Sequence, residues 1–176
     1  EEYAAAHAEL SAEELEEKAQ WHIDRMVEMG VTTVEAKSGY GLDTATERKQ
    51  LEVIKSLADK EDQKLRIVST FLGAHATPKE YKGRTAEYVD LIINEMLPAF
   101  KDLTTNCDIF CEKNVFEIED SRRLLNAAQE MGYKIKLHAD EIVTLGGAEL
   151  SAELGALSAD HLLHVSDQGV KDMAEK

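Results

Sequence analysis

The feature that most restricts the fold of this 176-residue chain is a regular alternation of strand-like and helix-like segments. Short runs rich in β-branched and aromatic residues alternate with longer segments whose apolar residues recur at helical spacing. The strand-like runs cover residues 32–38, 67–72, 108–111, 134–138 and 158–163. Strands that alternate with helices pair in parallel, because each helix carries the chain back to the same end of the sheet. The sequence therefore predicts an α/β fold with a parallel sheet.

The predicted helices have recognisable ends. Ser11 and Glu14 form a capping box, after which apolar residues recur at helical spacing until Gly30. A second helix is predicted from about Thr44, and Ser166 is a predicted N-cap for the last one. Three more helices are predicted around residues 89–96, 124–131 and 147–154. The chain is thus predicted to be a helix followed by five strand–helix units.

The number of units distinguishes two parallel architectures. An eight-unit barrel needs about 250 residues, or about 30 per unit, so a chain of this length holds about six units. A doubly wound open sheet is complete at this length, whereas an eightfold barrel would be present only in part. No Ser/Gly-rich linker or low-complexity stretch divides the sequence. We therefore expect residues 1–176 to be a single segment of one domain.

Charge and cysteine content restrict the partners and the compartment. The chain carries 20 Lys and Arg against 35 Asp and Glu, a formal net charge of −15, which repels nucleic acid and anionic membranes. Cys107 and Cys111 complete no zinc-binding spacing and are predicted to be buried thiols. The sequence shows no signal-peptide pattern and no apolar stretch of about 18 residues. We expect a cytoplasmic protein.

Several strand-like runs carry ionisable residues where a buried parallel strand is normally apolar. Alternation along each run places these pairs on one face: Glu35 with Lys37, Ser69 with His75, Asp108 with Glu112, and Lys136 with His138. A polar inner face at the carboxyl ends of parallel strands is where α/β enzymes keep their active sites. A compensated network of lysines and glutamates without any chemistry accounts equally well for the Lys and Glu residues of this set.

The densest group of ionisable residues ends the fourth strand-like run, where residues 136–141 (KLHADE) place one imidazole and two carboxylates within four residues. His138 suits a metal ligand, a general base or a neutral buried imidazole. His75 and His161 occupy equivalent places in their own units, so three imidazoles are expected to converge on one rim. Tyr40 lies between two glycines in a strand-to-helix loop, where a phenol can reach a ligand.

Six segments together resemble the imidazolonepropionase family of metal-dependent amidohydrolases. They are EAKSGYGLD (35–43), STFLGAHA (69–76), DIFCEK (108–113), KLHADE (136–141), GGAEL (146–150) and GALSADHL (155–162). The resemblance implies an (β/α)8 TIM-type barrel beside a small β-sandwich. This chain would hold about strands two to six of that barrel, without the β-sandwich and without the first and last barrel strands.

The resemblance also implies a reaction, which is hydrolysis of 4-imidazolone-5-propanoate to N-formimidoyl-L-glutamate in histidine degradation, at a zinc or iron ion. His138 would be a metal ligand, and His161 would position and polarise the metal-bound water. Glu141 would hydrogen-bond the imidazolone ring and assist proton transfer, and Tyr40 and His75 would contact this small-molecule substrate.

The family's His-x-His pair on the first strand and its metal-binding Asp on the eighth have no counterpart in this sequence. We therefore expect activity from a longer protein and not from these residues alone. Because a partial sheet leaves exposed edges, we also expect the chain to form homo-oligomers.

Two other functions remain open. One is a different amidohydrolase that opens a cyclic amide or deaminates a small heterocycle. Lys113 would then be central, since some relatives use a modified lysine near that position to bridge two metal ions. The other is a non-enzymatic, acidic α/β domain that binds partners and whose inner charges are structural.

Overall fold

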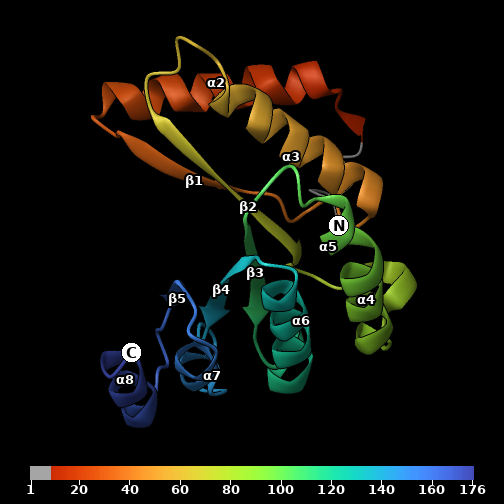
Figure 1. Ribbon diagram of the computed structural model, residues 1–176, viewed down its shortest axis with the longest axis vertical. Helices are drawn as coiled ribbons and strands as arrows, with labels where there is room; N and C mark the ends of the chain where they lie inside the picture. The colour runs from red at the N-terminus through yellow and green to blue at the C-terminus, as the bar shows by residue number, and fades with distance from the viewer. Residues whose placement is uncertain (1–8) are drawn as a thin grey trace.

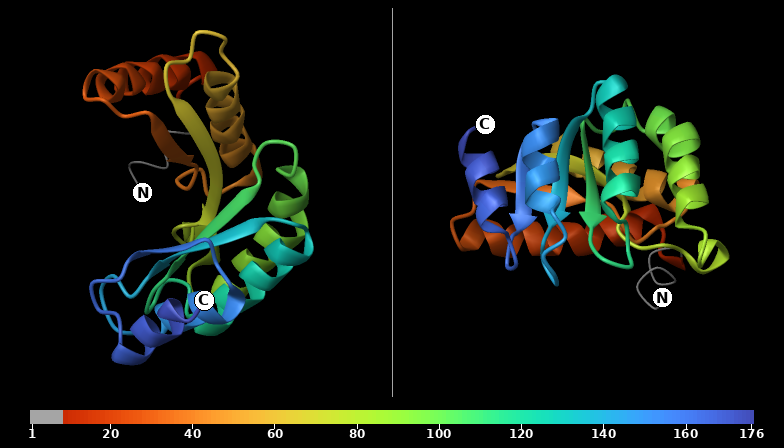
Figure 2. Two further views of the ribbon diagram at one scale, coloured as in Figure 1. Left: turned by 60° about the vertical axis from the view of Figure 1, so that its left-hand side comes forward. Right: turned by 90° about the horizontal axis from the view of Figure 1, so that it is seen from below.

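The computed structural model describes residues 9–176 and confirms an α/β fold with a parallel sheet. The described strands are β1 (Thr33–Lys37), β2 (Arg66–Ala74), β3 (Asn106–Cys111), β4 (Lys134–Ala139) and β5 (Ser158–His161). They lie side by side in chain order, and every neighbouring pair is parallel. The sheet curls, and the helices cover its convex side (Figure 1, Figure 2). The fold is a partial (β/α) barrel.

The helices follow the predicted order. They are α2 (Ala12–Glu28), α3 (Thr44–Ala58), α4 (Thr85–Leu91), α5 (Leu97–Ala99), α6 (Ile118–Glu130), α7 (Gly147–Leu154) and α8 (Asp167–Ala174), with a short 3-10 turn η1 (Lys79–Tyr81) and a π-helical turn η2 (Ile92–Met96). The predicted capping box of α2 is present, with the Glu14 N–H 3.1 Å from Ser11 Oγ. No helix in the described part of the chain is long and apolar enough to cross a membrane.

The predicted helix around residues 89–96 is not a single α-helix. It consists of α4, η2 and α5, and the π-helical turn ends two residues before Pro98. Proline has no N–H to donate, and its ring displaces the carbonyl four residues earlier. A wider turn directly before proline accommodates both effects.

The main core lies between the convex face of the sheet and the helices. Cys107 and Ile109 of β3 are buried there with Tyr88 of α4 and Leu124 of α6. Both cysteines, at 107 and 111, are free and buried, which confirms the prediction. A second, smaller cluster packs α2 and α3 against the start of the sheet through Ile23, Val53, Leu57 and Leu65.

Strand β2 differs from the prediction in which face its residues occupy. The register pairs Glu35 with Val68 and Lys37 with Thr70, and partners in neighbouring parallel strands point to the same face. Val68 and Thr70 therefore face the concave side, and Ser69 faces the helices. The predicted inward orientation of Ser69 was wrong.

A register shift restores His75 to the concave side. The pairing of β2 with β3 shifts between Phe71 and Ala74, as in a β-bulge, which adds a residue and changes the alternation beyond it. Gly73 lies within the shift, and a Cβ atom there would be 2.5 Å from the Phe71 ring. The shift explains why His75 nevertheless meets the other predicted site residues.

Helix α7 begins against a buried carboxylate. The side chain of Asp140 accepts N–H groups from four consecutive residues, Leu145 (2.8 Å), Gly146 (3.0 Å), Gly147 (3.2 Å) and Ala148 (2.9 Å). The Asp140 residue is fully buried. A negative charge at this place also interacts favourably with the helix dipole. Asp140 thus fixes both the start of α7 and the loop that leaves β4.

We predict that Asp140→Ala lowers the free energy of unfolding by about 3 kcal/mol or more, because several buried donors lose their acceptor at once. Ser166→Ala is the control, since it removes one capping bond from the Gly169 N–H (2.8 Å) at the start of α8, together with the bond that the hydroxyl donates to Glu149. That control should cost about 1 kcal/mol. Equal losses for the two variants in urea denaturation would contradict the prediction.

Among the described strands, β1 and β5 each pair on one side only. Unpaired strand edges recruit other strands. We therefore expect this chain on its own to self-associate, and sedimentation velocity measures that directly. A monomer with a high, cooperative melting transition would contradict the expectation.

Candidate functional site

The five predicted site residues all lie at the carboxyl ends of strands. Tyr40 is in the loop after β1, His75 directly follows β2, and His138 lies near the end of β4. Glu141 follows β4, and His161 ends β5. The strands are parallel, so these positions share one rim of the curled sheet.

The side chains form a continuous row along this rim. The ring centroids of Tyr40 and His75 are 4.4 Å apart, those of His75 and His138 are 6.0 Å apart, and those of His138 and His161 are 5.1 Å apart. Nε2 of His161 is 3.5 Å from a carboxylate oxygen of Glu141. The structure thus brings together all five residues, although their chemical roles remain predictions.

Strained backbone is found along the same rim. Leu42, Asp140 and His161 have positive φ angles of 61°, 49° and 73°, which are unfavourable for residues with a side chain. Each such residue costs on the order of 1–3 kcal/mol and persists only where its surroundings fix it. Positions of this kind cluster at binding and catalytic sites.

Asp108 of β3 orients the His138 ring. Its Oδ1 is 3.2 Å from Nδ1 of His138 and also accepts the Ile109 N–H at 2.7 Å. Burial raises the pKa of Asp108, but its hydrogen bond to His138 and the nearby Lys37 outweigh burial and leave the pKa below the usual 3.8. An ionised carboxylate only accepts hydrogen bonds, so Nδ1 of His138 carries the proton. In the neutral ring, Nε2 then has a lone pair for a ligand, as in metal-binding histidines whose other nitrogen contacts a carboxylate.

Lys37 of β1 joins two carboxylates across the concave face. Its Nζ is 2.6 Å from Asp108 and 2.8 Å from Asp160 of β5. Burial lowers the pKa of Lys37, but the two carboxylates outweigh burial and leave the pKa above the usual 10.5. Beside this cluster, Lys136 is 2.6 Å from Glu35. The inner lysines and acids therefore form a compensated network, as one interpretation of the sequence predicted.

This network decides which residues suit a metal ion. Donor atoms of Asp108, His138 and Asp160 lie within 4.8 Å of one another. The ammonium group of Lys37 already contacts both carboxylates, and a second cation beside it would be repelled by that ammonium. His138 is different, because Asp108 holds its ring through Nδ1 and leaves Nε2 for a ligand. Of these three residues His138 therefore suits a metal ion best, and its role as a metal ligand stays a prediction.

The sequence did not reveal the buried carboxylates that hold the loops of the rim. Glu112 follows β3 and is 1% exposed, and it accepts the backbone N–H groups of Lys113 and Ile142, both at 2.8 Å. It therefore fixes the segment that carries Glu141. Alternation predicted an inward-facing Glu112, but no sequence signal indicates that its partners are backbone amides.

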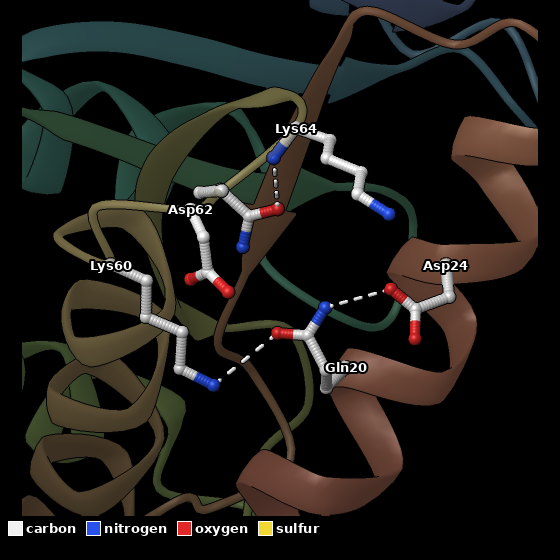
Figure 3. Close-up of a pocket in the computed structure, with 6 residues that line it drawn as sticks. Gln20, Asp24, Lys60, Asp62 and Lys64 are labelled. Atoms are coloured by element: carbon white, nitrogen blue, oxygen red, sulfur yellow. Dashed lines mark hydrogen bonds between the residues drawn. The ribbon is translucent and has the colours of Figure 1, made fainter.

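Several depressions mark the described surface, and two of them differ in where they lie relative to the rim. A cavity of about 730 Å³ adjoins Tyr40 and His75 and extends over apolar residues of α2 and α3. The other lies near the amino end of β2, where Gln20 accepts from Lys60 and donates to Asp24 (Figure 3). Its lining groups are polar and several of them pair with one another, and it lies at the opposite end of the strands from the rim.

In this partial parallel barrel, histidines and acids lie at the carboxyl ends of the strands. The chain is therefore a (β/α)-barrel protein, and its candidate site lies at the end of the barrel where such proteins carry their active sites. No family model matches the sequence. It is 60% identical over 172 residues to an imidazolonepropionase of Phocaeicola vulgatus, covering 97% of this chain and 42% of that protein. Imidazolonepropionases of Clostridium tetani and Streptococcus gordonii are 58% and 52% identical over 170 and 172 residues, covering 96% and 97% of this chain.

The chain is therefore homologous to the imidazolonepropionases over nearly its whole length. It spans 40% of the Clostridium tetani protein and 55% of the Streptococcus gordonii protein.

We predict that Lys37→Met lowers the free energy of unfolding by about 3 kcal/mol, because removing one partner of a buried ion pair leaves an uncompensated charge. The lowered pKa of Asp108 means that its share of this stability is present above pH 3.8 and is lost as pH falls further. The raised pKa of Lys37 means that its share is present below pH 10.5 and is lost as pH rises further.

The gap between wild type and Lys37→Met should therefore be widest near neutral pH and close toward both extremes, as measured by urea unfolding. Lys55→Met is the control, because Lys55 pairs with Asp59 on an exposed helix surface. This substitution should lower the free energy of unfolding by less than about 0.5 kcal/mol. A pH-independent gap would show that the ion pairs do not account for the loss.

Proposed function

We propose that this chain is the part of an imidazolonepropionase that binds the substrate and supplies one metal ligand. In the longer protein the reaction is hydrolysis of 4-imidazolone-5-propanoate to N-formimidoyl-L-glutamate, a step of histidine degradation. The observation that supports this best is the row from Tyr40 to Glu141 along one rim, in a chain 60% identical to a protein of that name.

A divalent metal ion, zinc or iron, fits His138 as one of its ligands. Such an ion, when bound, lowers the pKa of a water molecule and polarises a carbonyl group. Asp108 would keep the His138 ring in the orientation and protonation state that a ligand needs. Further ligands would come from the rest of the longer protein.

The remaining residues of the row would bind the substrate and move protons. Nε2 of His161 and a carboxylate oxygen of Glu141 lie 3.5 Å apart, so a small movement would bring them within hydrogen-bond reach and let them act together. They would take a proton from the attacking water and return one to the ring nitrogen as the C–N bond breaks. Burial and the neighbouring His138 lower the pKa of His75, so its ring is neutral near pH 7 and can both donate and accept hydrogen bonds. His75 and Tyr40 would contact the imidazolone.

The alternatives receive less support. Lys113, which a two-metal amidohydrolase of the modified-lysine type would need at the site, is exposed. A binding domain whose inner charges are purely structural accounts for the paired lysines and acids. Such a domain does not account for the three imidazoles that lie in a row beside the paired charges, because the imidazoles are not needed to balance those charges.

A chimera tests the proposal, with this chain replacing the aligned 172 residues of the Phocaeicola vulgatus protein. We expect the chimera to hydrolyse the imidazolone and this chain alone neither to hydrolyse it nor to bind metal tightly. In the chimera, His138→Ala should abolish metal binding. His161→Ala should retain the metal and lose about 100-fold or more in kcat, as expected for loss of acid–base assistance.

His164→Ala serves as the control, because this histidine is exposed, close in sequence and outside the row. Metal content by mass spectrometry and substrate depletion by absorbance are measured on all variants. Full activity of this chain alone would show that the ligands are misassigned, and an inactive, metal-free chimera would reject the proposed function.

A further inference from the structure

The loop that carries Tyr40 is held from behind by a buried carboxyl group that the proposed chemistry does not use. Glu47 of α3 is fully buried, and its Oε1 accepts the backbone N–H groups of Gly41 at 2.8 Å and Leu42 at 3.0 Å. The loop packs tightly against this helix, since a Cβ atom on Gly41 would lie 2.6 Å from the Glu47 backbone nitrogen. Glu47 thus binds the two residues that follow Tyr40.

A buried phenol connects this loop to the strand that carries His75. The hydroxyl of Tyr88, a fully buried residue of α4, lies 2.9 Å from the Gly73 carbonyl and 3.2 Å from the Leu42 carbonyl. Its single hydrogen is shared between these two acceptors. Gly73 lies two residues before His75, so the phenol joins the two segments whose aromatic rings are in contact.

The backbone of Leu42 is strained, and these contacts hold it in that conformation. Its φ of 61° is unfavourable for leucine, yet its N–H is bound by Glu47 and its carbonyl by Tyr88. Burial raises the pKa of both Glu47 and Tyr88, which reflects the free energy that each polar group costs in this environment. Apolar side chains would fill the same space without that cost. Two buried polar groups and one strained residue therefore keep a single loop conformation.

We propose that Glu47 and Tyr88 are positioning residues that fix Tyr40 against His75 for substrate binding. The inference rests on the proposed function, in which Tyr40 and His75 contact the imidazolone. Both residues bind backbone atoms of the loop, and each acts through that backbone.

The chain offers a matched control for Tyr88. Tyr133 is also buried, and its hydroxyl donates to the Leu97 carbonyl at 2.7 Å. It directly precedes β4, at the amino end of the sheet and away from the rim. Tyr88→Phe and Tyr133→Phe each delete a buried hydroxyl that serves backbone carbonyls, but only the first one lies behind the Tyr40 loop.

The first experiment uses this chain by itself and measures amide hydrogen exchange by NMR. Glu47→Ala should speed exchange at Gly41 and Leu42 by about tenfold or more, since each loses its acceptor. The Ile109 amide, which binds the Asp108 side chain instead, should be unchanged. Glu47→Gln should restore slow exchange, because an amide oxygen accepts the same two N–H groups. Unchanged exchange at both residues in Glu47→Ala would overturn the inference.

The second experiment measures steady-state kinetics in the chimera. Glu47→Ala and Tyr88→Phe should each raise KM about tenfold with a smaller effect on kcat, whereas Tyr133→Phe should leave KM unchanged even where it lowers stability. In a Tyr40→Ala background, Glu47→Ala should raise KM no further, because the residue it positions is absent. Equal KM changes for the two Tyr→Phe variants, or additive effects with Tyr40→Ala, would overturn the inference.

The two experiments separate this inference from the proposed function. An inactive chimera rejects the function, and hydrogen exchange in this chain still decides whether Glu47 fixes the loop. If the chimera is active but Glu47→Ala and Tyr88→Phe leave its KM unchanged, the proposed function stands and the inference is rejected.

Discussion

The carboxylate of Asp108 is the contact on which the concave face depends. It lies on the central strand of the sheet, has a side chain with no exposed surface, and binds Lys37 of β1 and His138 of β4 together. Through Lys37 it is also connected to Asp160 of β5. A charge buried this deeply is stable only when every partner is in place. The same bonds that compensate it join three strands across the concave face and hold the ring of the proposed metal ligand.

Buried carboxylates recur as anchors for the loops around this face. Glu47, Glu112 and Asp140 each accept backbone N–H groups from loops that follow strands β1, β3 and β4. A loop has few backbone partners of its own, and its unpaired N–H groups are costly when buried. A carboxylate accepts several of them at once and forms stronger hydrogen bonds than a neutral acceptor. The strands thus fix where the site lies, and these side chains fix how its loops are folded.

The sequence predicted the parts of the structure that follow from local periodicity. The order of strands and helices, the capping box at Ser11 and the burial of Cys107 were all evident, because each depends on residues close in sequence. The orientation of Ser69 was not. Alternation predicts faces only while the pairing register holds, and the shift in β2 arises from tertiary packing around Phe71 and Gly73.

The site residues were predictable for a related reason. His75, His138 and His161 lie at the ends of the second, fourth and fifth strands, and parallel strands bring such positions together whatever the details of packing. The partners that give these residues their properties were not predictable, since Asp108 and His138 are 30 residues apart and Glu47 binds backbone N–H groups of the loop. Alternation indicates that a residue faces inward, but it does not indicate which atom it meets there.

These contacts also separate two requirements of the proposed chemistry. The arrangement of Tyr40, His75 and Glu141 depends on anchors that all lie within the described residues, namely Glu47, Tyr88 and Glu112. Metal binding is different, because His138 would supply one ligand and a tetrahedral zinc site needs about three from the protein. The geometry proposed to recognise the substrate can therefore be present in this chain while the proposed reactive centre still depends on the rest of the barrel.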